Sequence, residues 1–397
     1  MPTSAVLYAK FSDIENALVI LNNNKMDAPF KPAGKSYLTF SSPSSFTLTV
    51  SEGSKGWNGT LEYFNSDKTW TVWDGTTALY SVDNSGEYAL YLRGARNTKI
   101  AGYHSSWVLT GSNIACIGNI ETLLDYAIVQ EGNHPSMTDY CYEHMFHGCT
   151  ALTQAPALPA TKLDYYCYGF MFYGCTSLTQ APALPATTLA NNCYNGMFHS
   201  CTSLTHAPTL PSTTLTTECY KSMFEGCTSL TKAPALPATT LAERCYSNMF
   251  YGCTALTQAP ALPATTLADY CYQYMLYGCT KIKVSSTQTG EYTIVYRIPT
   301  TGTGTTISNA LTGMFTNTGG TFTGTPSINT TYYLSTDNMV VRETDVATLR
   351  GYVGSMIDSV TPSMQTKITG NADDFVVIGS DGNVTTKTIL NAEELSF

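Results

Sequence analysis

The sequence contains few charged residues, which make up 12% of its 397 positions. Lys and Arg together number 20 against 29 Asp and Glu, and the net charge is −9. A nucleic-acid-binding surface needs a basic patch, because Lys and Arg release the counterions that surround phosphates. The balance therefore argues against nucleic acid as a partner. The polarity comes instead from Thr, Ser, Asn, Gly and 27 Tyr, a composition that indicates a neutral, β-rich protein of the extracellular or virion kind.

Long hydrophobic stretches are absent as well. No run of about 18 apolar residues occurs, so we predict no insertion into a membrane. Residues 1–10 lack the basic region and apolar core of a secretory signal peptide. A secreted adhesin ordinarily has one or the other, and their joint absence favours a protein that is assembled inside a cell and released with a particle. A chain whose leader had been removed would look the same.

The motifs of common catalytic sites are missing too. There is no Gly-rich phosphate loop, no zinc-type His pair and no Gly-x-Ser-x-Gly turn. The six histidines are scattered, and carboxylates such as Asp67 and Asp74 could serve a glycosidase only at the right separation. We therefore predict that the protein is not an enzyme and binds no cofactor and no metal. A glycan-degrading enzyme is kept as an alternative.

What the sequence has in abundance is repetition between Cys141 and Thr280. The pattern Cys-Tyr-x-x-Met-Phe-x-Gly-Cys-Thr-x-Leu-Thr-x-Ala-Pro-x-Leu-Pro-x-Thr-x-Leu restarts every 26 residues. Its copies begin at Cys141, Cys167, Cys193, Cys219, Cys245 and, in truncated form, Cys271. A fixed period of this length is the signature of a solenoid, in which each unit buries its apolar side against its neighbours.

Comparison among the repeats separates constant positions from variable ones. Met-Phe and two leucines recur almost unchanged, with Leu276 in place of Phe and Ser200 in place of Gly as small departures. We expect the constant residues to stack on their own copies. The prolines predict an extended segment that cannot be a central strand throughout. The near-helical spacing of Leu189, Cys193 and Met197 predicts one or two short helical turns that end at Gly.

These motifs resemble a known family. Met-Phe-x-Gly-Cys-Thr-x-Leu followed by Ala-Pro-x-Leu-Pro-Ala-Thr-Thr-Leu is similar to the leucine-rich repeats of the bacterial surface-antigen type, which occur in surface proteins of gut bacteria and in proteins of their phages. The resemblance covers residues 141–280. It implies a right-handed solenoid with a binding face and no enzyme activity.

All of the 13 cysteines except Cys116 lie in the repeats. Our main interpretation is that they form ladders of small buried hydrophobic residues, because free Cys is among the most buried residue types. Disulfides within each Cys-x7-Cys pair are a second possibility. A metal site is a third, although no short Cys-x-x-Cys pairing with His partners occurs.

The variable positions supply the candidate binding surface, in two rows. The Ala-Pro row, which precedes Ala-Pro in each repeat, contains Gln154, Gln180, His206, Lys232 and Gln258. The Gly-Cys row, which precedes Gly-Cys, contains His147, Tyr173, His199, Glu225, Tyr251 and Tyr277. Tyr, Gln and His combine apolar bodies with hydrogen-bonding tips, which suits the binding of glycan or protein surfaces. The alternative is that these positions are merely solvated.

The regions before the repeats differ from them in kind. Residues 1–30 have a heptad-like apolar spacing that predicts an amphipathic helix or attachment peptide. Residues 31–110 contain short alternating runs between turn signals, which predict a β-sandwich domain. Trp70 and Trp73 are three positions apart and so point to opposite faces of a strand, which makes at least one of them a core residue. Residues 111–140, rich in Ile and Leu, are predicted to cap the start of the solenoid.

The regions after the repeats are predicted to close the stack and to assemble copies. Residues 281–341 contain strand-like runs and an echo of Met-Phe at Met314, which predicts a cap built on an atypical last repeat. Residues 342–397 predict a short helix and a hairpin around Ser380-Asp381-Gly382. This end resembles the C-terminal parts of phage fibre and head-fibre proteins. Because neither element is stable alone, the resemblance implies a homo-oligomerisation or attachment module.

The fold prediction is a mixed α+β chain: an N-terminal β-sandwich, a leucine-rich-repeat solenoid of period 26 over residues 141–280, and a C-terminal helix plus hairpin. The function prediction is a non-enzymatic phage virion structural protein, of the fibre or head-fibre type, that displays the solenoid for attachment. Its expected partners are a glycan or protein of the host surface and the capsid or tail proteins of the virion. The alternative is a bacterial cell-surface leucine-rich-repeat adhesin.

Overall fold

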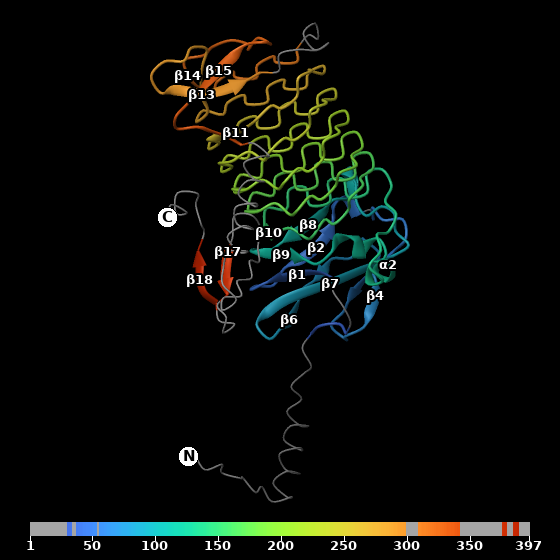
Figure 1. The fold of residues 1–397 in the computed structure, drawn as a ribbon. Helices are drawn as coiled ribbons and strands as arrows, with labels where there is room; N and C mark the ends of the chain where they lie inside the picture. The colour runs from blue at the N-terminus through green and yellow to red at the C-terminus, as the bar shows by residue number, and fades with distance from the viewer. Residues whose placement is uncertain are drawn as a thin grey trace, which may run out of the picture.

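The computed structural model describes residues 30–33, 37–53, 55–298, 309–341, 375–378 and 384–388 (Figure 1). This part of the chain is mostly strand and turn, arranged in several sheets, and its one α-helix is α2 (Tyr126–Gln130). The strands of the mixed α+β prediction are confirmed, and the described residues contain very little helix. The helices predicted within residues 1–30 and 342–362 lie outside them, apart from Phe30.

Two sheets form the N-terminal unit, which we define as residues 37–130. One strand of the larger sheet, β10, comes from the first repeat. The larger sheet has the strand order β10-β9-β1-β7-β3-β4, with β6 also paired to β7. Its strands are β1 (Leu38–Ser42), β3 (Thr60–Phe64), β4 (Trp70–Val72), β6 (Val82–Asn84), β7 (Glu87–Ala95), β9 (Ile114–Ile117) and β10 (Leu152–Gln154). The smaller sheet contains β2 (Thr47–Val50), β5 (Leu79–Tyr80) and β8 (Trp107–Thr110). Both sheets contribute buried residues to one core.

The tryptophans lie mainly in that core. Trp57, Trp73 and Trp107 are buried, and the Trp73 indole N–H donates to the carbonyl oxygen of Thr77 at 2.8 Å. Trp70 is half-buried and lies under the Arg93 guanidinium, which is 4.2 Å from its ring centroid. The prediction that at least one of Trp70 and Trp73 is a core residue is confirmed.

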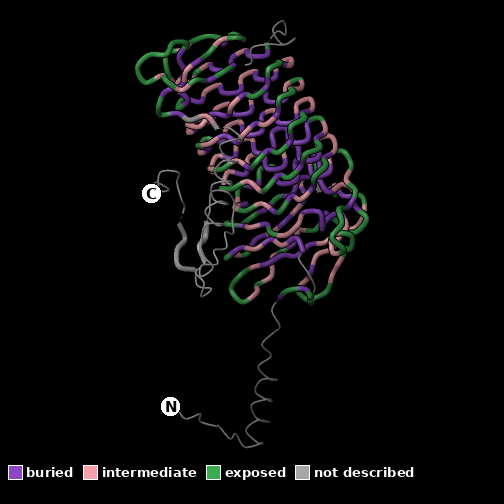
Figure 2. The backbone as a smooth tube through the Cα atoms, viewed as in Figure 1, coloured by how far each residue is buried: buried purple, intermediate pink, exposed green. Residues whose placement is uncertain are grey.

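The N-terminal unit continues into the repeats without a gap in the core. Strand β9 pairs antiparallel with β1 and parallel with β10, which belongs to the first repeat. The backbone N–H of Trp107 donates to the carbonyl of Met145 at 2.7 Å. Figure 2 shows the buried residues as one band that runs through both parts. The segment predicted as a cap, 111–140, contains β9, the short 3₁₀ helix Ile120–Leu123 and α2, and it connects the two parts.

Constant aromatic residues of the repeats stack on their own copies. The phenylalanine rings from Phe146 to Phe250 follow one another with centroid distances of 5.5 to 5.8 Å and interplanar angles of 2 to 8°. The tyrosine rings from Tyr142 to Tyr272 form a second ladder with centroid distances of 5.6 to 5.9 Å. Both ladders are buried. The expected stacking of constant residues is confirmed for these two positions.

The segment before each Gly-Cys is a run of turns rather than a helix. In the second repeat, the N–H groups of Gly169 and Met171 donate to the carbonyls three residues earlier, whereas those of Phe170 and Phe172 donate to Asn195 and Met197 of the next repeat. A helix would direct every N–H to a carbonyl four residues back. The prediction of short helical turns is therefore wrong, because half of the donors here connect neighbouring repeats.

Backbone conformation explains how these turns are built. Every fourth residue of the run has a positive φ, as in Tyr166, Phe170 and Gly174. A positive φ at the third residue of a turn is the requirement of type II geometry, which Gly or Asn meets most easily. Gly occupies this position before most of the second cysteines, and Ser200 adopts φ 60° in the one exception. The conserved Gly is therefore a turn residue.

The proline-containing segments form only short strands. Isolated parallel bridges connect Gln180 to His206, His206 to Lys232, and Lys232 to Gln258. Longer pairing occurs at the two ends, in β10 and in β11 (Gln258–Pro260), which pairs parallel with β16 (Met339–Val341). Proline has no N–H to donate, and this limits each segment to a few bridges. The expected short extended segment is confirmed.

A four-stranded sheet follows the last repeat, in the order β13-β15-β12-β14. Its strands are β12 (Lys283–Ser285), β13 (Tyr292–Arg297), β14 (Gly319–Gly320) and β15 (Thr331–Ser335). The turns around Met314 accept hydrogen bonds from the sixth repeat, with Leu276 N–H donating to the Met314 carbonyl at 3.1 Å. Further along the chain, β17 (Phe375–Ile378) pairs antiparallel with β18 (Val384–Thr388), as the hairpin signal predicts.

Candidate binding surface

The Ala-Pro row lies along the line of parallel bridges between the repeats. Gln154, Gln180 and His206 are exposed, whereas Lys232 and Gln258 are half-buried. Paired strands lie about 4.8 Å apart, so the bridged members of the row repeat at a short, regular distance. At the far end, Gln258 pairs with Met339 of β16. The structure therefore brings the bridged members, Gln180 to Gln258, together and covers the last of them in part.

The Gly-Cys row is a stack of side chains. His147 lies on Tyr173 at 4.8 Å between ring centroids and Tyr173 on His199 at 4.5 Å. Further along, Tyr251 lies on Tyr277 at 4.4 Å and 6°. His147 is exposed and the other members are half-buried. Stacked rings cover each other's faces, so this row presents ring edges and polar tips to solvent rather than flat faces.

Backbone hydrogen bonds hold the Gly-Cys row in place. Gly148 donates to the carbonyl of Tyr173 at 2.7 Å, Gly174 to that of His199 at 2.8 Å and Ser200 to that of Glu225 at 2.7 Å. Gly226 and Gly252 make the same bond to Tyr251 and Tyr277. Each row member after His147 is thus held by the turn of the preceding repeat through its backbone, independently of its side chain.

In the middle repeats, charged side chains lie in and beside the Gly-Cys row. His199 Nδ1 lies 3.9 Å from a carboxylate oxygen of Glu225, and Lys221 Nζ lies 3.1 Å from one of Glu218. Burial lowers the pKa of His199, and the neighbouring Glu225 carboxylate partly opposes this shift. The Arg244 guanidinium lies 4.2 Å from the ring centroid of Tyr270. The surface therefore changes from aromatic to charged and back along the stack.

A cluster that the sequence did not single out lies at the start of the stack. Its members are Tyr103, His144 and Phe170, in contact with His147 and Tyr173 of the Gly-Cys row. Phe170 lies at the position equivalent to His144, and the variation of this position among the repeats is a sequence signal for it. Tyr103 comes from the N-terminal unit, in the 3₁₀ helix Tyr103–Ser105, and no sequence signal connects it to the repeats.

Comparison with known families gives one match. The model described as the BspA type leucine rich repeat region fits residues 124–257 and 167–295, in six copies. Residues 124–295 are therefore similar to leucine-rich repeats of the BspA type. The match supports the predicted resemblance to the bacterial surface-antigen type. Searches of curated proteins and of solved structures gave no match, and nothing found supports the resemblance to phage fibre and head-fibre proteins.

The cysteines of the BspA-type repeats are free thiols in buried ladders. Burial raises the pKa of each, in Cys219 to about 11 and in Cys201 to about 12. In the second series, each thiol from Cys175 to Cys279 donates to a carbonyl of the preceding repeat, as in Cys201 Sγ to Phe172 O at 3.0 Å, and Cys149 Sγ donates to Trp107 O of the N-terminal unit at 3.1 Å. The prediction of buried cysteine ladders is confirmed, and the thiols have a hydrogen-bonding role in addition.

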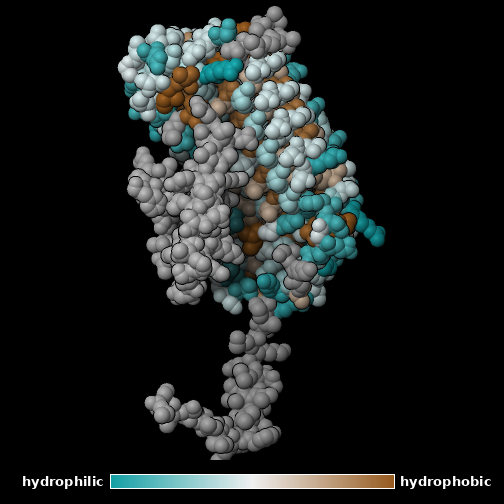
Figure 3. All heavy atoms as spheres, viewed as in Figure 1, coloured by the Kyte–Doolittle hydropathy of each residue, from teal (hydrophilic) through white to brown (hydrophobic). Residues whose placement is uncertain are grey.

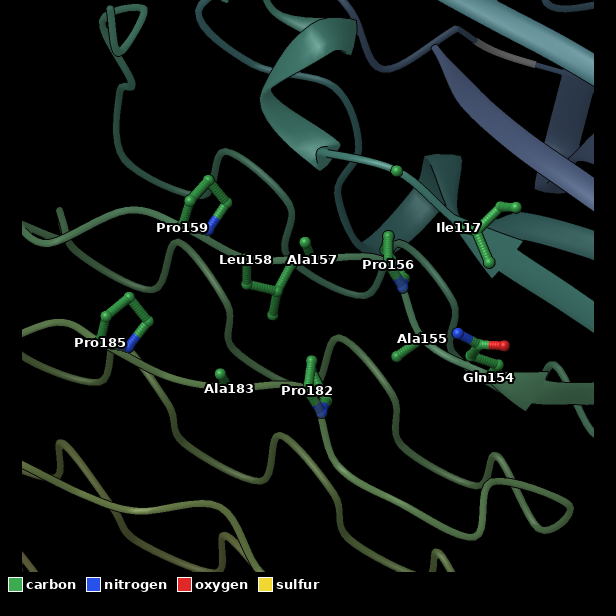
Figure 4. Close-up of a pocket in the computed structure, with 11 residues that line it drawn as sticks. Ile117, Gln154, Ala155, Pro156, Ala157, Leu158, Pro159, Pro182, Ala183 and Pro185 are labelled. Carbon is green, nitrogen blue, oxygen red and sulfur yellow. The ribbon is translucent and has the colours of Figure 1, made fainter. Parts of the chain in front are cut away.

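A shallow groove of about 440 Å³ lies beside the first two BspA-type repeats. Figure 4 shows Pro156 and Pro159 of one repeat beside Pro182 and Pro185 of the next, with Ile117 of β9 at one end. Its lining is mostly apolar, and Gln154 is the one member of the Ala-Pro row that reaches it. Figure 3 shows a surface of mostly white and teal residues with small, separate brown patches.

A buried carboxylate lies where the N-terminal unit meets the repeats. Glu121 is 1% exposed; one of its carboxylate oxygens lies 2.8 Å from His134 Nδ1, and the other has no hydrogen-bond partner. Burial raises the pKa of Glu121, and the hydrogen bond and charge of His134 partly oppose this shift. The pair has no substrate-sized cavity beside it among those described, and we treat it as structural.

Neither a metal site nor a membrane-spanning helix is found in the described parts of the chain. No group of three or more His, Cys, Asp or Glu is placed to hold a metal ion there. No helix among the same residues is long and apolar enough to cross a membrane.

Proposed function

We propose that the protein is a surface adhesin-type leucine-rich-repeat protein that attaches to a glycan or protein of a host surface without catalysing a reaction. In this proposal an N-terminal β-sandwich carries a right-handed solenoid of 26-residue repeats. The observation that supports it best is the Gly-Cys row, where varied His, Tyr and Glu side chains are held at one repeated place on BspA-type repeats.

Constant and variable positions of each repeat differ in burial, and this difference supports binding rather than catalysis. Constant Phe, Tyr, Met and Cys residues are buried, and the Phe and Tyr rings stack on their copies, whereas members of the two variable rows reach the surface. A rigid scaffold that presents variable polar and aromatic side chains is suited to recognition, because little conformational entropy is lost on binding. A glycan-degrading activity would show as release of reducing sugar from host polysaccharide, and we expect none.

The test compares three sets of substitutions within the first four repeats. We expect the full chain to bind host cells or immobilised mucin, and the triple variant His147→Ala, Tyr173→Ala, His199→Ala to bind at least about tenfold more weakly. A second triple variant changes Gln180, His206 and Lys232 to Ala and measures the contribution of the Ala-Pro row.

The matched control changes Thr188, Thr214 and Thr240 to Ala. These exposed residues form another row on the same repeats, with a parallel bridge between Thr214 and Thr240. We expect the control to bind like the unmodified chain. Equal binding by all variants, or no binding by the unmodified chain, would contradict the proposal.

Display on a virion is the second candidate, and the β17–β18 hairpin is the observation that favours it. A two-stranded hairpin is marginally stable alone, so packing of several copies around an axis would stabilise it. Light scattering tests assembly: we expect the full chain to be an oligomer and a chain lacking residues 342–397 to be a monomer. Capsid and tail genes beside this gene would favour the virion, and outer-membrane genes the bacterial surface.

A further inference from the structure

An aromatic cluster joins the N-terminal unit to the first repeats on the exposed side of the turns. Tyr103 is its outermost member, with 66% of its surface exposed. The Tyr103 ring meets His104 at 4.8 Å and His144 at 5.1 Å between centroids, at interplanar angles of 87 and 89°. Two perpendicular imidazole contacts hold this ring in place, yet most of its surface remains open to solvent.

Two short ring stacks connect Tyr103 to the repeats through His144. His144 lies on Phe170 at 5.0 Å and 26°, and His147 lies on Tyr173 at 4.8 Å and 16°. The two imidazoles are 5.3 Å apart. Phe170 in turn lies against Gly196, where an added Cβ would come within 2.4 Å of the ring. The cluster is therefore rigid, and its inner rings have their faces covered.

Two histidines of the cluster, His144 and His147, are uncharged at neutral pH. Burial, followed by the neighbouring His147, lowers the pKa of His144 to about 4, and burial also lowers the pKa of His147. The Nδ1 atom of His144 is buried and has no hydrogen-bond partner. Charged groups of both signs lie at the rim: Glu52 pairs with His104 at 3.1 Å, Glu143 lies 3.7 Å from His144, and the Lys99 ammonium, beside Gly102, partly opposes the raised pKa of Glu143.

We propose that Tyr103, with His144 and His147, binds a neutral hexopyranose unit of a surface glycan. An exposed tyrosine offers a flat apolar face to the C–H side of a sugar ring and a hydroxyl at its edge. The exposed imidazole of His147 can donate and accept hydrogen bonds with sugar hydroxyls, while the buried His144 positions the Tyr103 ring. An anionic sugar finds no positive charge on His144 or His147, because both imidazoles are neutral at neutral pH. This inference rests on the proposed attachment function and names its ligand class.

The experiment measures binding of the full chain to immobilised oligosaccharides of glucose, galactose, mannose and N-acetylglucosamine, beside sialylated forms of the same sugars. We expect binding to at least one neutral sugar and weaker binding to its sialylated form. The variant Tyr103→Ala should lower the affinity by at least about tenfold, the typical effect of removing an aromatic anchor. His147→Phe preserves the stacking and removes the nitrogens, and we expect a smaller loss.

The matched control is Tyr80→Ala. Tyr80 lies in β5 of the same unit and is 70% exposed, but none of the described ring contacts involves it. We expect this control to bind like the unmodified chain, with both variants unfolding at the same temperature.

Three outcomes would overturn the inference: no sugar binding, equal binding by Tyr103→Ala, or a preference for sialylated sugars. If the chain binds cells while any of these holds, the sugar site is wrong and the attachment function stands. If the chain binds sugars but no cell or mucin surface, the attachment function is wrong and the site is retained.

Discussion

The N-terminal unit and the repeats bury the same kinds of side chains in two different ways. Around the tryptophans of the N-terminal unit the rings are inclined to one another: Trp73 and Trp107 meet at 75°, and Phe40 and Trp107 at 46°. In the repeats, every pair of the phenylalanine ladder is within 8° of parallel. Each contact of the N-terminal core is unique, whereas each contact of the ladder is a copy of the one before. A hydrophobic core can thus be built from contacts that all differ, as in the N-terminal unit, or from copies of one contact, as in the repeats.

The largest test of this comparison removes one rung of the ladder. Phe198 lies between Phe172 at 5.6 Å and Phe224 at 5.7 Å, and it is fully buried. We expect Phe198→Ala to lower the free energy of unfolding by about 3–5 kcal/mol, because a cavity opens and two stacking partners are lost. Urea denaturation followed by circular dichroism measures the change.

The control for this prediction is Phe198→Leu. Leu276 occupies the same position in the sixth repeat and is fully buried there. We expect a loss below about 1.5 kcal/mol, as for other exchanges between large apolar residues. Equal losses for Ala and Leu would mean that ring stacking, rather than filled volume, stabilises the ladder.

The second test compares a glycine from each region. At Gly94 in β7, an added Cβ would lie 1.6 Å from the backbone carbonyl oxygen of Leu123. We expect Gly94→Ala to destabilise the protein by about 3 kcal/mol, since backbone must move to make room. Thermal unfolding monitored by tryptophan fluorescence reports on this unit, which contains all four tryptophans.

Gly148→Ala is the matched change in the repeats. Nothing lies within 4 Å of an added Cβ there, and the only cost is the positive φ of 73°. We expect a loss of roughly 1–2 kcal/mol. Ser200 already adopts this conformation in the third repeat, so a complete loss of folding on Gly148→Ala would contradict our account.

The third test asks what the buried tyrosines contribute through their hydroxyls. Tyr296 donates to the carbonyl of Pro260 at 2.9 Å, whereas the hydroxyl of Tyr220 is buried without a partner. We expect Tyr296→Phe to cost about 1–2 kcal/mol and Tyr220→Phe to be neutral or stabilising. Urea midpoints of the two variants give the answer, and a larger loss for Tyr220→Phe would contradict it.

The smallest test concerns pH and the junction of the two regions. The raised pKa of Glu121 means that the fold favours its protonated form. Its contribution to stability is therefore full below the ordinary value of 4.5 and is lost as the pH rises through the raised pKa. We expect Glu121→Gln to be relatively more stable than the unmodified chain at pH 7 than at pH 4. Unfolding temperatures of both proteins from pH 4 to pH 7 measure the difference. If the two temperatures change with pH in the same way, the raised pKa of Glu121 is contradicted.

Repetition also explains which parts of the structure could be predicted. Phe146 and its copies were identified as stacking residues because the sequence compares itself at 26-residue intervals, and strands such as β3 followed from simple alternation. The turns containing Phe170 were predicted as helical, because apolar spacing alone cannot show that alternate N–H groups bond to the next repeat. Their positive φ values, carried by residues other than Gly, leave no clear trace in the sequence.

The candidate surface was predictable to a similar degree. The Gly-Cys row was found from its variation, and the structure shows His147, Tyr173 and His199 in contact. Tyr103 could not be found, because its approach to His144 depends on how the N-terminal unit docks on the first repeat. Contacts between a unique region and a repeated one have no internal copy with which to compare.

The bonds between neighbouring repeats have a mechanical consequence. Each turn segment donates alternate N–H groups along the stack, from Phe170 to Asn195 and from Phe172 to Met197. Tension between the two ends of the array would act on all of these bonds in series and would break them one repeat at a time. A repeat of 26 residues extends by up to about 90 Å when its chain is pulled straight. An anchored protein of this design would lengthen in steps under shear flow while its remaining repeats stayed folded.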